Sequence, residues 1–120
     1  MYTTTQLLKD ALELIRDERK WCEGSVHNMR GQRCALGALY HASGSKHSGL
    51  IHVALRELRQ AMLARVHKDV SSVYDPYNHN TVHMVGNSRL PSETVIAALN
   101  NTQGHKFVVE SFKDAIRDSL

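Results

Sequence analysis

The sequence predicts an all-α protein, a compact bundle of about five helices with a long irregular loop between the third and the fourth. Five segments carry apolar residues on one side at helical spacing. This periodicity fails between Asp69 and Arg89, where turn-forming residues dominate. A chain of 120 residues with 42% apolar composition can build one modest core. Residues 1–120 are therefore predicted to form a single helical domain.

The first helix begins at a capping box. Thr3 and Gln6 have the spacing at which a hydroxyl and a side-chain amide each satisfy an unpaired backbone N–H. The apolar face that follows consists of Leu7, Leu8, Ala11, Leu12, Leu14 and Ile15. Gly24 is expected to end this helix, because glycine favours the conformation found at helix C-termini.

The second helix is expected to begin near Cys34 and to end at the Ser-Gly-Ser sequence of residues 43–45. Gly37 costs a helix about 1 kcal/mol relative to alanine. Because three alanines accompany it, we expect another helix to approach this segment closely. The two cysteines, Cys22 and Cys34, are interpreted in the same way, as buried or half-buried thiols.

The third helix is the longest and spans residues 50–67. Its buried face is predicted to carry Ile51, Ala54, Leu55, Leu58, Ala61, Met62 and Val66. Val53 and Leu63 fall outside that face, with Arg56 and Arg59 near them. These four side chains are predicted to form an exposed, mixed apolar and basic surface for a protein partner. Ordinary scattered surface apolarity is the alternative.

Residues 69–89 are interpreted as a long loop, within which Tyr77, Val82 and Met84 could form a short extended piece. A connection of about 20 residues is unusual in a compact domain, which favours either a functional role or disorder.

Two further helices are expected after this loop. Pro91 suits the opening of a fourth helix, which is predicted to end around Asn100-Asn101. A fifth helix is predicted from His105 to Leu120. Its apolar face consists of Val108, Val109, Phe112, Ala115 and Ile116.

The cysteines and histidines predict no metal site. Cys22 and Cys34 are separated by eleven residues, and His79 and His83 are the histidine pair with ligand-like spacing. Structural zinc sites usually draw paired ligands from tight turns such as C-x2-C, so the wide cysteine spacing argues against zinc.

A thiol-dependent enzyme is a competing class. Cys34 follows a basic residue at a predicted helix N-terminus, and His27 or His41 could serve as its base. The sequence nevertheless carries no catalytic signature. We therefore expect no catalytic residues, no cofactor and no metal.

The charge balance also limits the binding classes. Fifteen basic and twelve acidic residues give a formal charge of +3, which is weak for a dedicated nucleic-acid binder. Weak nucleic-acid binding stays the alternative function, through a basic surface formed by Arg30, Arg33, Arg56, Arg59, Arg65 and Lys68. No stretch approaches the roughly 18 apolar residues of a membrane span, so a cytoplasmic protein without membrane association is expected.

Three motifs resemble those of a known family. They are W-C-E-G at residues 21–24, C-A-L-G-A-L at residues 34–39, and A-L-N-N followed by F-K-D-A-I near the end. The chain resembles a small uncharacterised domain of bacteria and their phages with W-C-x-G, C-A-L-G-A-L and a late W-N-D turn. It departs from that pattern at Leu99 and Asn101, which stand in place of tryptophan and aspartate. The resemblance implies a compact helical domain without an assigned activity.

Together these features predict a small cytoplasmic protein-interaction module without catalytic activity. Kinship with phage domains makes it a candidate phage-encoded, host-interacting protein. Self-association as a homodimer is the simplest form of this hypothesis.

Overall fold

The computed structural model describes residues 1–44, 48–85 and 89–120, which form five α-helices and one β-hairpin. The elements are α1 (Thr4–Ile15), the 3-10 helix η1 (Glu18–Lys20), α2 (Ala35–Ser43), α3 (Ser48–Arg65), β1 (Ser72–Asp75), β2 (Asn80–His83), α4 (Ser92–Gln103) and α5 (His105–Ser119). The protein is therefore mostly helical, as predicted. The all-α prediction is corrected by the two-stranded antiparallel sheet.

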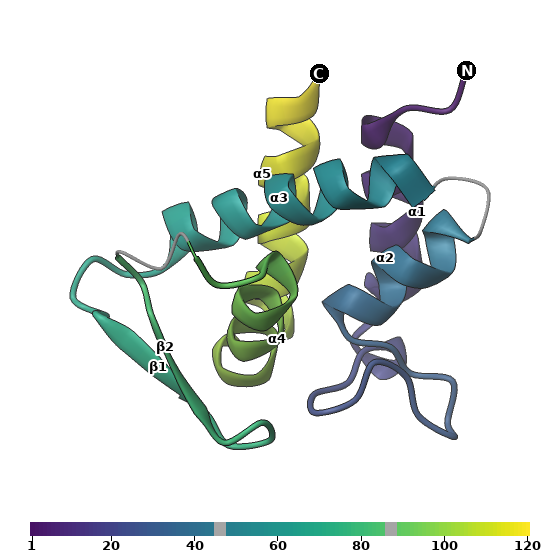
Figure 1. Ribbon diagram of the computed structural model, residues 1–120. Helices are drawn as coiled ribbons and strands as arrows, with labels where there is room; N and C mark the ends of the chain where they lie inside the picture. Colours follow the sequence, from purple (N-terminus) through teal and green to yellow (C-terminus); the bar gives the residue numbers. More distant parts are fainter. Residues whose placement is uncertain (45–47, 86–88) are drawn as a thin grey trace.

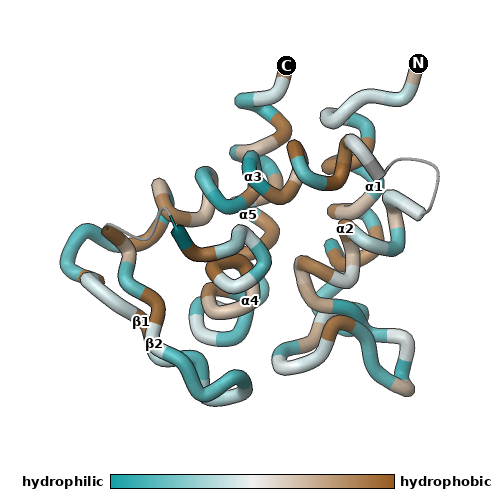
Figure 2. Tube along the Cα trace, viewed as in Figure 1, coloured by the Kyte–Doolittle hydropathy of each residue, from teal (hydrophilic) through white to brown (hydrophobic). Residues whose placement is uncertain are grey.

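The helices pack around a shared hydrophobic core. In Figure 1, α3 runs across the other helices, from the side of α1 and α2 to the side of the hairpin. Hydrophobic and hydrophilic residues alternate along α3 and α5, as expected for helices with one buried face (Figure 2). The largest fully buried side chains are Phe112, Leu7, Leu8, Leu12, Ile15, Leu39, Leu58, Met62, Ile96, Leu99, Val82 and Val95. No helix in the described ranges is long and apolar enough to cross a bilayer.

The beginning of α1 confirms the predicted capping box. The Thr3 hydroxyl accepts from the backbone N–H of Gln6 (3.2 Å), and the Gln6 side chain accepts from the backbone N–H of Thr3 (2.7 Å). The predicted end at Gly24 is wrong, because α1 ends at Ile15. The Asp17 carboxylate accepts from the backbone N–H of Arg19 and starts η1 instead.

The predicted second, third and fifth helices are present with small shifts at their ends. Cys34 is the N-cap of α2, and α2 ends at Ser43; Ser45, the last residue of the predicted stop, lies outside the described residues. Helix α3 begins two residues before the predicted Leu50 and ends at Arg65. Helix α5 spans nearly the whole of the predicted segment.

The predicted long loop contains the hairpin. Strand β1 pairs with β2 in the register Ser72↔His83, Val73↔Val82, Tyr74↔Thr81 and Asp75↔Asn80. Val73 and Val82 are buried, whereas Tyr74, Thr81 and His83 are exposed. Each strand has only four residues, too few for its alternation to stand out from a loop. Residues 86–88 of this segment lie outside the described ranges.

Helix α4 continues past its predicted end. It runs to Gln103, so Asn100 and Asn101 are helical, and both are buried. Asparagine often ends a helix because its side chain competes for backbone hydrogen bonds. In this protein the two side chains are bonded to other segments.

Candidate functional site

A buried polar network joins the segment around Trp21 to α4. Oδ1 of Asn100 accepts hydrogen bonds from the indole Nε1–H of Trp21 (2.8 Å) and the backbone N–H of Ala35 (3.0 Å). Its Nδ2 donates to the carbonyl of Cys22 (3.1 Å) and to Oδ1 of Asn101 (3.2 Å). Asn100 is fully buried, so a side chain lacking either a donor or an acceptor would leave buried polar groups unpaired.

Asn101 extends this network to the hairpin. Its Oδ1 accepts from the backbone N–H of Gly24 (2.8 Å), and its Nδ2 lies 3.1 Å from each carboxylate oxygen of Asp75. The Asp75 carboxylate also accepts from Nδ2 of Asn78 (2.7 Å) and from the backbone N–H of Tyr77 (3.0 Å). We call the following set the asparagine network: Trp21, Asp75, Asn100 and Asn101.

Two glycines permit close contacts beside this network. Gly24 has a positive φ of 79°, and a Cβ there would lie 2.6 Å from Cε1 of the Tyr77 ring. A Cβ on Gly37 would overlap the carbonyl oxygen of Val26 and lie 2.8 Å from its carbonyl carbon. The close approach predicted at Gly37 therefore exists, but its partner is the backbone of the 22–33 loop. The prediction that another helix makes this approach is wrong at Gly37 itself, whereas α2 as a whole packs against α1, as expected.

The thiols are packed, as expected, and Cys34 also caps a helix. Cys34 is buried, and its Sγ accepts from the backbone N–H of Gly37 (3.5 Å) at the start of α2. Cys22 is half-buried, and its Sγ donates to the carbonyl of Ser25 (3.4 Å). Burial raises the pKa of both thiols, which opposes formation of the nucleophilic thiolate. His41 Nδ1 lies 3.3 Å from a guanidinium nitrogen of Arg33.

The histidines of the considered zinc site lie on the hairpin. His79 and His83 are both exposed, and Nδ1 of His79 lies 3.4 Å from the Tyr74 hydroxyl. Within the described ranges, no group of three or more histidine, cysteine, aspartate or glutamate side chains could hold a metal ion.

Two surface hollows share Val26 as a lining residue, and one of them also reaches Asn101 of the asparagine network. The smaller, about 160 Å³, is lined by Gly24, Ser25, Val26, Cys34, Leu36, Asn78, Ala97 and Asn101. The larger, about 350 Å³, is lined by Val26, His27, Arg33, Gly37, Tyr40 and His41. Val26, Tyr40 and Tyr77 are exposed around them. We call these three side chains and the two hollows the loop face.

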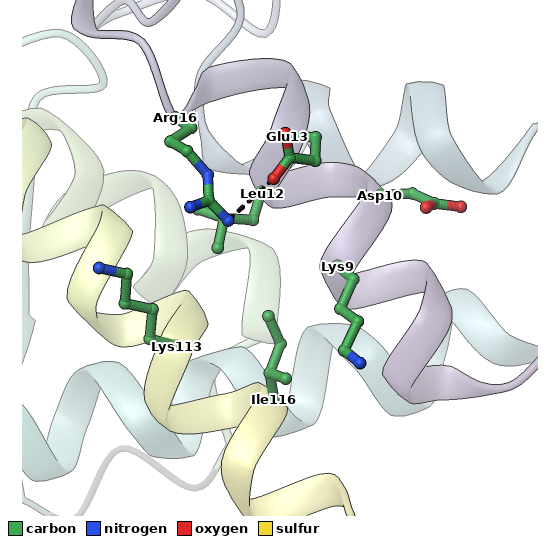
Figure 3. Close-up of a pocket in the computed structure, with 7 residues that line it drawn as sticks. All are labelled: Lys9, Asp10, Leu12, Glu13, Arg16, Lys113 and Ile116. Carbon is green, nitrogen blue, oxygen red and sulfur yellow. Dashed lines mark ion pairs between the residues drawn. The ribbon is translucent and has the colours of Figure 1, made fainter.

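A third hollow, about 350 Å³, lies between α1 and α5 (Figure 3). It is lined by Lys9, Asp10, Leu12, Glu13, Arg16, Lys113 and Ile116. Four of its five charged side chains already have partners: Arg16 pairs with Glu13 (2.8 Å), Lys113 with Glu110 (3.5 Å), and Asp10 accepts from Tyr2. Most of its charged side chains are thus already engaged within the protein.

The surface predicted on α3 is only partly accessible. Arg56 is exposed and Val53 is half-buried. Leu63 is half-buried and packs against the core. Nη1 of Arg59 donates to the carbonyl of Leu90 (2.7 Å). This surface is therefore less apolar and less basic than the sequence indicated.

The basic residues considered for nucleic-acid binding are divided between two ends of the molecule. Arg30 and Arg33 belong to the 22–33 loop, whereas Arg65 is the last residue of α3 and Lys68 follows it. This end of α3 lies beside the hairpin, away from that loop (Figure 1). Arg65 donates to Oδ2 of Asp114 at 2.9 and 2.7 Å.

Sequence reasoning missed the asparagine network. One signal was present: Asn100 follows Ile96 by four positions, so it continues the buried face of the fourth helix. Burial of an asparagine requires hydrogen-bond partners, and these lie 79 and 65 residues away, at Trp21 and Ala35. The sequence carries no indication of which residues they are.

Residues 1–118 match a family described as "Family of unknown function (DUF6197)". The searches of curated proteins and of solved structures found no significant match.

Proposed function

This chain belongs to the DUF6197 family, and we propose that it is a cytoplasmic, noncatalytic module that binds a protein partner through the loop face. The observation that carries this proposal is an exposed aromatic side chain that is held through both its ring and its backbone. Tyr77 is 51% exposed, yet its ring lies against Gly24 and its backbone N–H donates to the buried Asp75. An aromatic side chain held in this way loses little conformational entropy on binding.

The smaller hollow supports a partner that inserts one apolar side chain. Its walls include the apolar residues Val26, Leu36 and Ala97, and Ser25 and Asn78 add polar groups. A cavity of about 150 Å³ is large enough for a benzene-sized group, and this one is about 160 Å³. Pockets that receive one anchor residue beside exposed tyrosines are typical of the centres of protein interfaces.

The surroundings of the thiols and of Asp75 favour binding over catalysis. The pKa of Cys34 is raised by burial, and its sulfur caps a helix. Asp75 accepts hydrogen bonds from two side-chain amides and from backbone N–H groups, which use its oxygens structurally. The resemblance to bacterial and phage domains favours a partner in a bacterial host.

Affinity capture from the native host tests this proposal with matched variants. Ala97→Leu fills the smaller hollow, and Tyr77→Ala removes the exposed ring. Both should reduce capture of the partner by at least about tenfold, corresponding to about 1.4 kcal/mol. Two control variants make matched changes elsewhere. Tyr74→Ala removes another exposed tyrosine of the hairpin, and Ala64→Leu makes the same alanine-to-leucine change at an exposed position on α3. Both controls should capture the partner as the wild type does.

Two results would contradict the loop face. If the Tyr77→Ala and Tyr74→Ala variants captured the partner equally well, the ring of Tyr77 would have no specific role in binding. Loss of capture in Arg56→Glu alone would assign the interface to the α3 surface. Mass measurement of the purified protein tests the homodimer, and a dimer broken by Ala97→Leu would make a second copy the occupant.

Nucleic-acid binding is the alternative function and has a separate test. A basic surface would retain duplex DNA or RNA at low salt and release it as the salt concentration rises. Because Arg59 and Arg65 are engaged within the protein, any such binding should depend on the four remaining basic residues, Arg30, Arg33, Arg56 and Lys68.

A further inference from the structure

The larger hollow of the loop face contains an arginine without a carboxylate partner. Among the described residues, Arg16, Arg19, Arg65 and Arg117 each lie within 4 Å of a carboxylate. Arg30, Arg56 and Arg89 form no such pair in the described part of the chain, but they are exposed. Arg33 is half-buried, and its side chain bonds only to Nδ1 of His41 within the described part of the chain. A guanidinium that lacks an anion retains most of its donors for a ligand.

Backbone hydrogen bonds hold the main chain of Arg33 in place. Its N–H donates to the carbonyl of Lys20 (2.9 Å), and its carbonyl accepts from the N–H of Cys22 (3.1 Å). His27 forms an antiparallel bridge with Arg33, so these two residues are neighbours across the loop. Positions fixed on both sides by backbone hydrogen bonds need little reorganisation when a ligand binds.

The other polar groups of the hollow can also donate hydrogen bonds. When His41 is neutral, its bond from Arg33 makes Nδ1 the acceptor and leaves Nε2–H as a donor. Burial, with a smaller contribution from Glu93, raises the pKa of Tyr40, so its hydroxyl keeps its proton. None of the described residues that line the hollow is acidic.

We propose that this hollow, formed by His27, Arg33, Tyr40 and His41, is a binding site for a small phosphate monoester. An arginine fork and three further donors suit the three terminal oxygens of a phosphate better than the two of a carboxylate. The volume of about 350 Å³ exceeds that of the phosphate alone and leaves space for a small organic group. The site does not require the protein partner proposed above.

Nuclear magnetic resonance titration of the full chain tests this site. The probes are inorganic phosphate, ribose 5-phosphate and uncharged ribose. Both phosphates should produce saturable shifts in the backbone signals of residues 26–27, 33 and 37–41, and ribose should produce none. Arg33→Gln should weaken binding by at least about tenfold. Arg30→Gln, at an exposed position outside the hollow, should stay within about twofold of the wild type.

A replacement variant and a second ligand complete the test. If Arg33→Gln does not fold, the double variant His27→Gln and His41→Gln replaces it, because both side chains are exposed. This variant should bind several-fold more weakly. Absence of saturable shifts at tens of millimolar phosphate would overturn the proposal, and so would equal weakening by the Arg33 and Arg30 variants. Tighter binding of a short DNA duplex than of ribose 5-phosphate at the same residues would assign the hollow to nucleic acid instead.

Discussion

At the scale of single residues, the asparagine network depends on the placement of donors and acceptors. Asp75 is a fully buried carboxylate whose partners are amide and backbone N–H groups. Asn101 links it to the rest of the network because its two ends have opposite roles. Nδ2 donates to Asp75, while Oδ1 accepts from Gly24 and Asn100. An aspartate at position 101, the residue of the resembled family pattern, could not donate in this way when ionised.

Asn101→Asp should therefore destabilise the protein by about 3–5 kcal/mol, because it places two carboxylates in contact in a buried site. Urea denaturation measures this change. Gln60→Glu adds the same charge at an exposed position and should change stability by less than about 0.5 kcal/mol. Adding Asp75→Asn to Asn101→Asp should restore much of the lost stability, because the amide introduced at position 75 can then donate to the carboxylate introduced at position 101. An equal loss in the single and double variants would contradict the assigned bond.

Gly37 and Gly49 offer a second test, because both lie in helices and have different surroundings. A Cβ on Gly37 would overlap the backbone of Val26, whereas one on Gly49 meets no atom of the described residues within 4 Å. Gly37→Ala should destabilise by about 1–3 kcal/mol, and Gly37→Leu by more. Gly49→Ala should stabilise by up to about 1 kcal/mol, because alanine has the higher helix propensity. Thermal unfolding of the pair gives the two signs, and an unchanged melting temperature in Gly37→Leu would contradict the close approach.

At the scale of elements, each helix is stabilised mainly by burial of one face, since helices of this length are marginal alone. Helix α5 interrupts its buried face with Ser111, which is fully buried. Its hydroxyl has no hydrogen-bond partner within the described protein. The hairpin is also stabilised by packing, because an isolated two-stranded sheet is marginally stable. Its strands contact α4, and its Val73 and Val82 belong to the hydrophobic core.

Ser111→Ala should stabilise the protein by about 1 kcal/mol, because it removes a buried hydroxyl without a partner at little change in volume. Ser119→Ala on the same helix should have the opposite sign, because Oγ of Ser119 bonds to Thr5 (2.7 Å) and to the carbonyl of Ile116 (2.8 Å). Chemical denaturation of both variants measures the difference. Destabilisation by Ser111→Ala would show that its hydroxyl is hydrogen-bonded in solution.

At the scale of the whole molecule, the asparagine network connects segments that are distant in the chain. Trp21 and Asn100 are 79 positions apart, and Asp75 and Asn101 are 26 apart. The 22–33 loop and the hairpin turn lie along the same edge of the fold, with α4 between them and above (Figure 1). Opening this edge requires loss of buried hydrogen bonds on both sides, so the loop face should open only with much of the fold.

The thiol of Cys34 reports such opening. In a Cys22→Ser background, a disulfide reagent should react with Cys34 far more slowly in the native protein than in denaturant, since the side chain is 5% exposed. Reaction at the rate of the denatured protein would contradict this and would revive a thiol-dependent activity.

Burial of the thiols also predicts the direction of an alkaline pH dependence. Because burial raises the pKa of Cys22 and Cys34, the folded protein keeps these protons at pH values where the unfolded chain loses them. The free energy of unfolding should therefore fall as the pH rises above about 8.5, the ordinary thiol value. Replacing both cysteines with alanine should flatten this part of the profile, and an unchanged profile would exclude the thiols as its cause.

The sequence by itself determined the features that depend on near neighbours. The Thr3–Gln6 capping box and the buried faces of the helices follow from spacings of three or four residues, which the chain displays directly. The need for a small residue at Gly37 was also visible, because glycine in a helix requires a compensating contact. The cysteines were correctly interpreted as packed thiols.

Only the tertiary structure decided which distant groups meet. The close partner of Gly37 is a loop carbonyl, Asn100 and Asn101 bond to other segments, and the predicted loop pairs as a hairpin against α4. The same holds for the hollow around Arg33, whose donors come from the 22–33 loop and α2. The physical reason is that hydrogen bonds between distant segments leave no periodic trace in a single sequence, because each partner is specified by geometry that exists only after the helices have packed.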